Sequence, residues 1–164
     1  MIREAKSLLE SVIKEAVPGV TVVKSAADES RQIGVRKFPL VSLITLPGTF
    51  DESEARVVRY YDETGQYKGR YVRGYRNLPI VIRCWAEGED AADAAASAIM
   101  PCIPSQWVYD GFTCRVELVS EEHSDHAGNA SKLYVSAFEV CFNGAATRKP
   151  DEIPVVENVQ VQYE

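Results

Sequence analysis

The chain has 164 residues, a formal net charge of −6 and a charged fraction of 26%. This length fits one domain with a core that needs neither disulfides nor metals, and the apolar fraction of 46% excludes general disorder. The acidic balance excludes unspecific adhesion to polyanions over the whole surface, so a nucleic-acid contact would require a local basic patch.

The first predicted element is an amphipathic helix over residues 2–17. Its apolar residues have the three–four spacing of one helical face. They are Ile2, Ala5, Leu9, Val12, Ile13 and Ala16. Pro18 and Gly19 end the helix. The charged N-terminus lacks the apolar segment of a secretion signal, and no stretch approaches the roughly 20 apolar residues that span a bilayer, so we expect synthesis in the cytoplasm.

Short strands and one long hairpin are predicted next. Residues 20–23 are rich in β-formers, the polar residues 24–36 predict a loop, and residues 38–44 predict a strand whose early proline suits its start or a sheet edge. Residues 55–76 place β-formers on both sides of the turn signal at 62–65. This pattern predicts a long β-hairpin.

The second half alternates strands with one more helix. Residues 78–86 predict a strand, and residues 88–100 predict an alanine-rich helix with acids in its first turn. Residues 112–119 alternate as a half-buried strand does. A polar loop is expected over 120–131, followed by a strand over 133–142.

The order of these elements predicts an α+β fold. Two helices are too few for a doubly wound sheet. We therefore expect a mostly antiparallel sheet with two helices packed on one face and a long protruding β-hairpin. We expect one domain over residues 1–145 and an extended C-terminal arm over 146–164, whose β-prone end would pair with another subunit.

Only one cluster resembles a metal site. It holds both histidines of the chain, and its weak candidate ligands are His123, Asp125 and His126. A His-x-x-His pair in a loop lacks the helical spacing that aims both rings at one point, and a polar loop between strands is ordinary. A solvated loop is the favoured interpretation and a metal site the alternative; no cofactor is expected.

The sequence contains no recognisable catalytic constellation. Nucleophilic catalysis needs a base beside the nucleophile, and the only histidines lie in the loop described above. Neither a GxSxG elbow nor a glycine-rich phosphate loop is present. Cys84 and Cys114 lie in step with apolar neighbours, which predicts that both are core residues. We therefore expect a protein that is not an enzyme.

The predicted hairpin combines arginine with tyrosine, and these residues form the candidate oligomer interface. They are Arg56, Arg59, Tyr60, Tyr61, Tyr67, Arg70, Tyr71, Arg73, Tyr75 and Arg76. Both residue types are enriched at hot spots of protein interfaces. Two alternatives remain open: an exposed ribbon stabilised by cross-strand aromatic pairs, and a nucleic-acid contact with stacked tyrosines.

The charges of the chain are distributed unevenly. From Glu117 onward there are nine acids and three basic residues, whereas the hairpin region is basic. Opposite patches on one protomer suit head-to-tail contacts, which close into rings when the rotation permits.

The order of these elements and the local sequence of several of them resemble the tail-terminator, or tail-completion, proteins of bacteriophages and prophages. Six segments carry the resemblance in addition to the N-terminal helix, one of them the alternating strand over 112–119. The other five are Arg76–Ile82, the helix start at Gly88–Asp93, the stop at Ile103–Pro104, the Glu121–Asp125 loop and the strand Val135–Phe142. It covers roughly residues 1–145.

The resemblance implies a ring-forming structural subunit, commonly a hexamer, that caps the tail tube and meets the head connector. It implies no enzymatic activity and no cofactor. The protein would reside in the bacterial cytoplasm during assembly and then in the virion tail, with DNA passing through the ring. The alternatives are another head-tail or baseplate component, and a metal-binding or enzymatic domain that uses the His123–His126 loop.

Overall fold

The computed structural model describes the chain except residues 36, 62–63, 66, 110, 126–132 and 149–164. It gives the backbone alone for some further residues within strands. These are residues 53–56, 58–61, 67–68, 70–71, 122–125 and 145–148. The C-terminal arm expected over 146–164 therefore lies almost entirely outside the described residues.

The described elements form an α+β fold dominated by one seven-stranded sheet. In chain order they are α1 (Ile2–Ala16), β1 (Thr21–Val23), α2 (Ala26–Val35), β2 (Leu40–Thr45), β3 (Thr49–Tyr61), β4 (Tyr67–Ala86), α3 (Glu89–Ile99), the 3-10 helix η1 (Met100–Cys102), β5 (Gln106–Tyr109), β6 (Phe112–Asp125) and β7 (Tyr134–Arg148). The sheet order is β1-β2-β4-β7-β6-β5, and β3 pairs with β4 beside that path. Only the β1–β2 pair is parallel among the described pairs.

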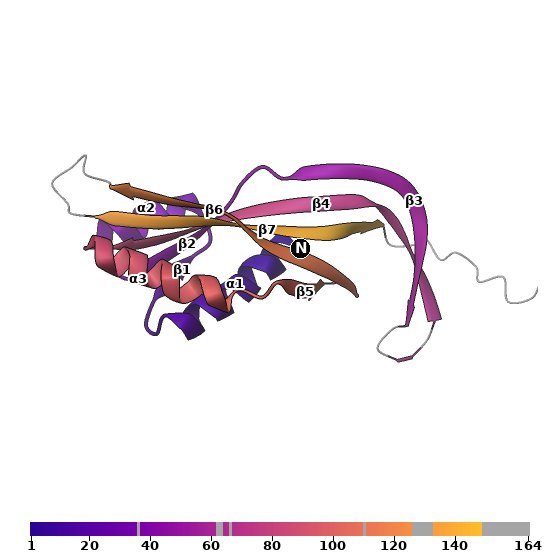
Figure 1. Ribbon diagram of the computed structural model, residues 1–164, viewed down its shortest axis with the longest axis horizontal. Helices are drawn as coiled ribbons and strands as arrows, with labels where there is room; N and C mark the ends of the chain where they lie inside the picture. The colour runs from indigo at the N-terminus through magenta and orange to yellow at the C-terminus, as the bar shows by residue number, and fades with distance from the viewer. Residues whose placement is uncertain (36, 62–63, 66, 110, 126–132, 149–164) are drawn as a thin grey trace, which may run out of the picture.

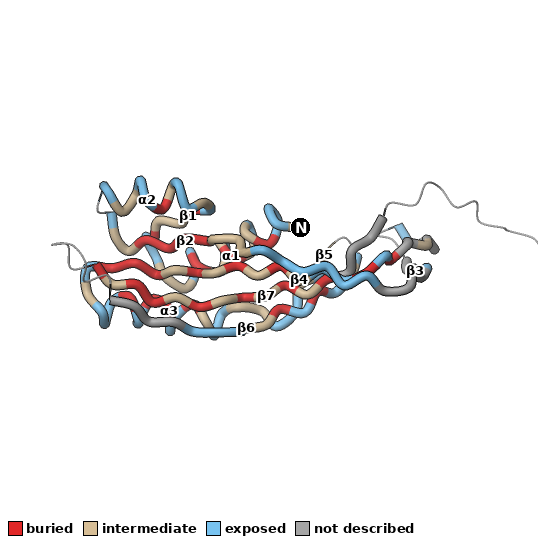
Figure 2. Tube along the Cα trace, turned by 90° about the horizontal axis from the view of Figure 1, so that it is seen from above, coloured by how far each residue is buried: buried red, intermediate tan, exposed pale blue. Residues whose placement is uncertain are grey.

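The main core lies between the sheet and helices α1 and α3. Helix α1 buries Ala5, Leu9 and Ile13, the face that its sequence spacing predicts. Helix α3 adds its own small apolar residues, and both contact the same face of β2, β4 and β7. Figure 1 shows α1 and α3 below the sheet, and Figure 2 shows buried positions alternating along the central strands. Period-two alternation places one set of these side chains on the face that α1 and α3 cover.

The structure corrects two expectations about the helices. The chain contains three α-helices in its described part, because residues 26–35 form α2 where the polar sequence predicts a loop. Helix α2 packs against the face opposite to α1 and α3. Its Ile33 contacts a second small cluster that includes Leu40 and Trp85, which alternate with core-facing neighbours. The expectation of a loop is therefore wrong for residues 26–35, and the expectation of two helices on one face is wrong because a third helix lies on the opposite face.

Strands β3 and β4 form a long antiparallel ribbon. We call the residues Thr49–Tyr61 and Tyr67–Asn77 the β3–β4 ribbon, since the pairing runs between Thr49↔Asn77 and Tyr61↔Tyr67. Two bulges interrupt the ladders at the same level, one between Glu52 and Arg56 and one between Val72 and Gly74. Bulges bend and twist a strand. Figure 1 shows the two strands curving away from the plane of the sheet.

Strand β4 is longer than the sequence suggests, because the expected hairpin arm and the expected strand over 78–86 are one continuous element. Pro79 lies inside this strand, and its residue partner in β7 is Cys141. Among the described residues, no helix is long and apolar enough to cross a membrane.

Candidate functional site

The ten candidate interface residues all belong to strands β3 and β4. The register places Tyr61 opposite Tyr67, and Tyr60 opposite Lys68. Side chains are described for three of the ten, namely Arg73, Tyr75 and Arg76, and all three are exposed. Seven have a described backbone only. They are Arg56, Arg59, Tyr60, Tyr61, Tyr67, Arg70 and Tyr71.

Arg73 pairs with Glu52, an acid that precedes the expected hairpin at residues 55–76. Its Nε and Nη2 atoms lie 3.0 Å and 2.9 Å from Oε1 of Glu52, on the facing strand. Both side chains are about two-thirds exposed, at 66% and 62%, so solvent screening keeps the energy of this pair small. The ribbon around Arg73 is therefore less basic than the arginines of residues 55–76 alone imply.

The expected histidine loop is largely a strand. Strand β6 continues to Asp125, and the backbone of His123 pairs with Ser136 in β7. The expectation of a loop over 120–131 is therefore wrong for residues 120–125. His126 lies outside the described residues. In the part of the chain that the structure does describe, no group of three potential metal ligands lies together.

A buried carboxylate forms a site that the sequence analysis missed. Glu29 of α2 is only 5% exposed. Its Oε1 atom accepts hydrogen bonds from the hydroxyl of Ser42 and from Nε1 of Trp85, the latter at 2.8 Å. Its Oε2 atom lies 3.2 Å from Nη1 of Arg83. These four residues, which we call the Glu29 cluster, fasten α2 to the sheet.

The start of α2 carries a sequence signal that could have revealed this helix. Ser25 accepts a hydrogen bond from the backbone N–H of Asp28 at 3.1 Å, and its hydroxyl donates to Oδ2 of Asp28 at 2.7 Å. A serine three residues before an acid is the sequence signature of a capped helix start. The buried Glu29 follows directly, but no local pattern identifies its partners in β2 and β4.

The Glu29 cluster contains a serine beside a carboxylate, yet it offers no access to a substrate. Ser42 has no exposed surface, and Trp85 is 7% exposed. Only Arg83 reaches solvent, with 38% of its side chain exposed. A buried charge that is hydrogen-bonded on both oxygens is a structural anchor rather than a reactive group.

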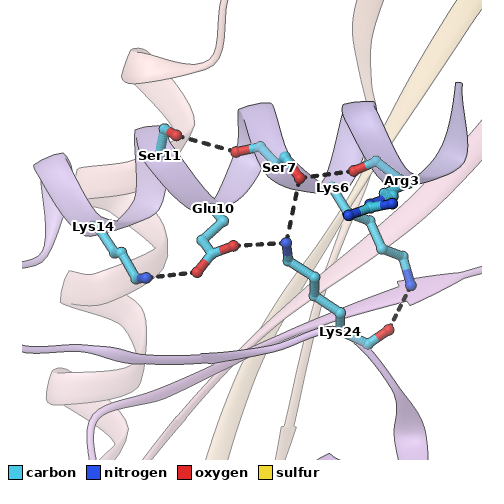
Figure 3. Close-up of polar contacts among 7 residues, drawn as sticks. All are labelled: Arg3, Lys6, Ser7, Glu10, Ser11, Lys14 and Lys24. Atoms are coloured by element: carbon cyan, nitrogen blue, oxygen red, sulfur yellow. Dashed lines mark hydrogen bonds and ion pairs between the residues drawn. The ribbon is translucent and has the colours of Figure 1, made fainter.

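A second polar cluster joins α1 to the residue after β1 (Figure 3). Glu10 accepts from Lys14 one turn later, and its other oxygen lies 2.7 Å from Nζ of Lys24. These hydrogen bonds, first from Lys14 and then from Lys24, lower the pKa of Glu10. The ammonium of Lys6 donates to the carbonyl of Lys24 at 2.6 Å, and its pKa is lowered by partial burial and by the nearby Lys24 charge. The cluster fixes the end of β1 on the helix.

The cysteines are free thiols with different environments. Cys84 and Cys114 are each 1% exposed, which confirms their predicted core positions. Burial raises the pKa of the Cys84 thiol to about 12, and burial also raises the pKa of Cys114. Cys102 is exposed and donates to the carbonyl of Ala98 at the end of α3. The two core thiols act as small apolar residues.

A comparison with protein-family models finds no matching family, and a comparison with curated proteins finds no match either.

Proposed function

We propose that this protein is a ring-forming structural subunit of a phage or prophage tail, which terminates or completes the tail tube and joins it to the head connector. The observation that carries the proposal is the β3–β4 ribbon, with its arginines and tyrosines on paired strands. In this proposal the ribbon is a protruding hairpin, the subunit needs no cofactor, and its partners are copies of itself, tube proteins and connector proteins.

The ribbon supports a contact role because its distal part lies outside the main core. The β4–β7 ladder ends at Tyr71↔Arg148, whereas the β3–β4 ladder continues to Tyr61↔Tyr67. The distal residues thus have one strand neighbour among the described elements. A two-stranded ribbon is only marginally stable alone. A neighbouring subunit, or the wall of a channel around passing DNA, would provide the missing contacts.

The chemistry of the described side chains agrees with assembly better than with catalysis. The buried polar side chains among the described residues are Glu29, Ser42 and Ser136. The first two belong to an inaccessible anchor. Exposed arginine and tyrosine, in contrast, bring large contact area and hydrogen bonds at moderate entropic cost.

Native mass spectrometry of the purified protein tests the assembly part of the proposal. We expect a closed oligomer, commonly a hexamer, with a central opening in negative-stain electron microscopy. Reversing the charges at Arg70 and Arg73 together should lower the oligomer mass. An exclusively monomeric protein, or an unchanged assembly after the double reversal, would contradict this role of the ribbon.

The tail function has a separate test in the phage that carries the gene. A subunit that caps the tube stops its growth, so deletion should yield tubes of broad, increased length without attached heads. Expression of the intact chain in trans should restore uniform tails. Normal tails in the deletion strain would exclude the terminator role.

A further inference from the structure

The sheet has two long outer edges that no described strand covers. Strand β5 pairs with β6 only as far as Gln106↔Arg115, so β6 has a strand neighbour on one side alone from Glu117 to Asp125. Strand β3 pairs with β4 and with no other described strand. Figure 2 shows β6 at the border of the molecule. An uncovered edge presents backbone groups that can pair with another strand.

Both edges carry exposed apolar side chains. Leu118 and Val119 on β6 are 52% and 56% exposed, and Val57 on β3 is 48% exposed. Monomeric proteins protect such edges with lysine, proline or a bulge. The segment 117–125 contains neither lysine nor proline. The bulge between Leu118 and Ser120 and the acidic side chains protect it, and acidic side chains disfavour pairing only with an edge that is itself acidic. Exposed apolar groups at an uncovered edge favour strand addition.

The charges of the two edges are opposite. The segment Ser120–Asp125 carries three acids and neither lysine nor arginine, whereas Ala55–Tyr61 carries two arginines and no acid. Pairing two copies through the same edge would place like charges opposite one another, which is destabilising. Pairing the acidic edge of one copy with the basic edge of the next brings opposite charges together.

The topology lets one subunit use both edges at once. Strand β6 lies beyond β7, and β3 lies on the other side of β4. Two different patches on opposite sides make a head-to-tail contact, which closes into a ring or continues as a filament. A symmetric dimer would leave half of these edges uncovered.

We propose that the outer edge of β6, residues 117–125, pairs with the outer edge of β3, residues 55–61, of a second copy of this chain. The sheet then continues from subunit to subunit. This inference rests on the proposed ring assembly and names the surface through which the ring is joined.

Two complementary charge reversals test the proposal by native mass spectrometry. One variant carries Glu121→Lys and Glu122→Lys on β6, and the other carries Arg56→Glu and Arg59→Glu on β3. Each variant alone places like charges on the two edges that meet at every contact between subunits, so we expect loss of most of the wild-type oligomer. An equimolar mixture restores opposite charges at every joint when the variants alternate, so we expect the wild-type mass to return.

Two further variants keep the result independent of folding. Arg31→Glu on α2, where the side chain is 75% exposed, is the matched control and should leave the oligomer mass unchanged. Val119→Lys adds one lysine to the β6 edge and should lower the oligomer mass at unchanged circular dichroism, even where the double variants fold poorly.

The outcomes separate this proposal from the tail function. Intact wild-type oligomers in both charge-reversed variants and in Val119→Lys would overturn the edge pairing and leave the ring itself standing. A mixture of folded variants that does not regain the wild-type mass would also overturn it. A monomeric wild-type protein would overturn the edge pairing as well, while the tail-length measurement decides the function separately.

Discussion

Replacing Glu29 by alanine should destabilise the protein more than any exposed substitution. The change leaves the buried Ser42 hydroxyl and Trp85 Nε1 without their acceptor. An orphaned buried donor costs about 1–3 kcal/mol, so the two together contribute about 3 kcal/mol. Arg83 is 38% exposed and can turn to water, so loss of its ion pair adds at most about 1 kcal/mol. We expect a total loss of about 3–4 kcal/mol.

Urea unfolding followed by circular dichroism measures this loss. A domain of this size loses about 2–4 °C of Tm per kcal/mol, so Tm should fall by roughly 10 °C. Glu29→Gln keeps one carbonyl acceptor and the shape of the side chain, and it should cost only about 1–2 kcal/mol. Glu15→Ala in α1, an exposed position, is the control and should change stability by less than about 0.5 kcal/mol.

Hydrogen exchange gives the same prediction a local readout. Glu29 is the one buried residue among those described in α2. Its removal should therefore accelerate exchange over residues 26–35 before it affects the strands. If Glu29→Ala unfolds within about 0.5 kcal/mol of the wild type and α2 keeps its protection, the anchoring role of this carboxylate is refuted.

Two further predictions concern the core and the ribbon. Burial raises the pKa of Cys84 from 9.0 to about 12 in the folded state, so the unfolded state loses this proton first as pH rises. The free energy of unfolding should therefore be unaffected by this thiol below pH 9.0 and should fall between pH 9.0 and about 12. The slope from this thiol is at most about 1.4 kcal/mol per pH unit. Urea midpoints should therefore fall less steeply in Cys84→Ala than in the wild type, and the slope that remains in the variant comes from other groups such as Cys114, whose pKa burial also raises. A Cβ at Gly74 would lie 2.3 Å from the carbonyl oxygen of Asp51, so Gly74→Ala should separate β3 from β4. It should cost about 1–3 kcal/mol and accelerate amide exchange over 49–61, while Gly88→Ala, which meets no atom within 4 Å, should not.

The sequence predicts well those elements whose signal is local. The apolar spacing of α1 and the alternation at the start of β6 arise from neighbours in the chain, and the structure places a helix and a strand there. Helix α2 lacks such an apolar face, since the one residue described as buried in it is a glutamate. Its partners lie 13 to 56 positions away, and no local pattern reports a contact at that separation.

The candidate site shows the same limit. Clustering of arginine and tyrosine in residues 55–76 is visible in the sequence, and these residues do lie on two paired strands. The pairing of Arg73 with Glu52 depends on the register, because Glu52 precedes the basic segment and faces it only after the chain reverses. The extension of β6 to Asp125 likewise depends on its ladder with β7, which gives a polar segment strand partners that composition does not predict.

The fold separates the residues that stabilise the domain from those that are available for contacts. Within β4, the main core takes Leu78, Ile80, Ile82 and Cys84, all in the half that α1 and α3 cover. The other half belongs to the ribbon, where Arg73 and Tyr75 are exposed. Val72 is buried there but does not belong to the main core. Substitutions at exposed ribbon positions should therefore change association while leaving global unfolding nearly unchanged, since cooperative stability follows buried apolar contacts. A chain built this way can vary the exposed side chains of its ribbon without losing its fold.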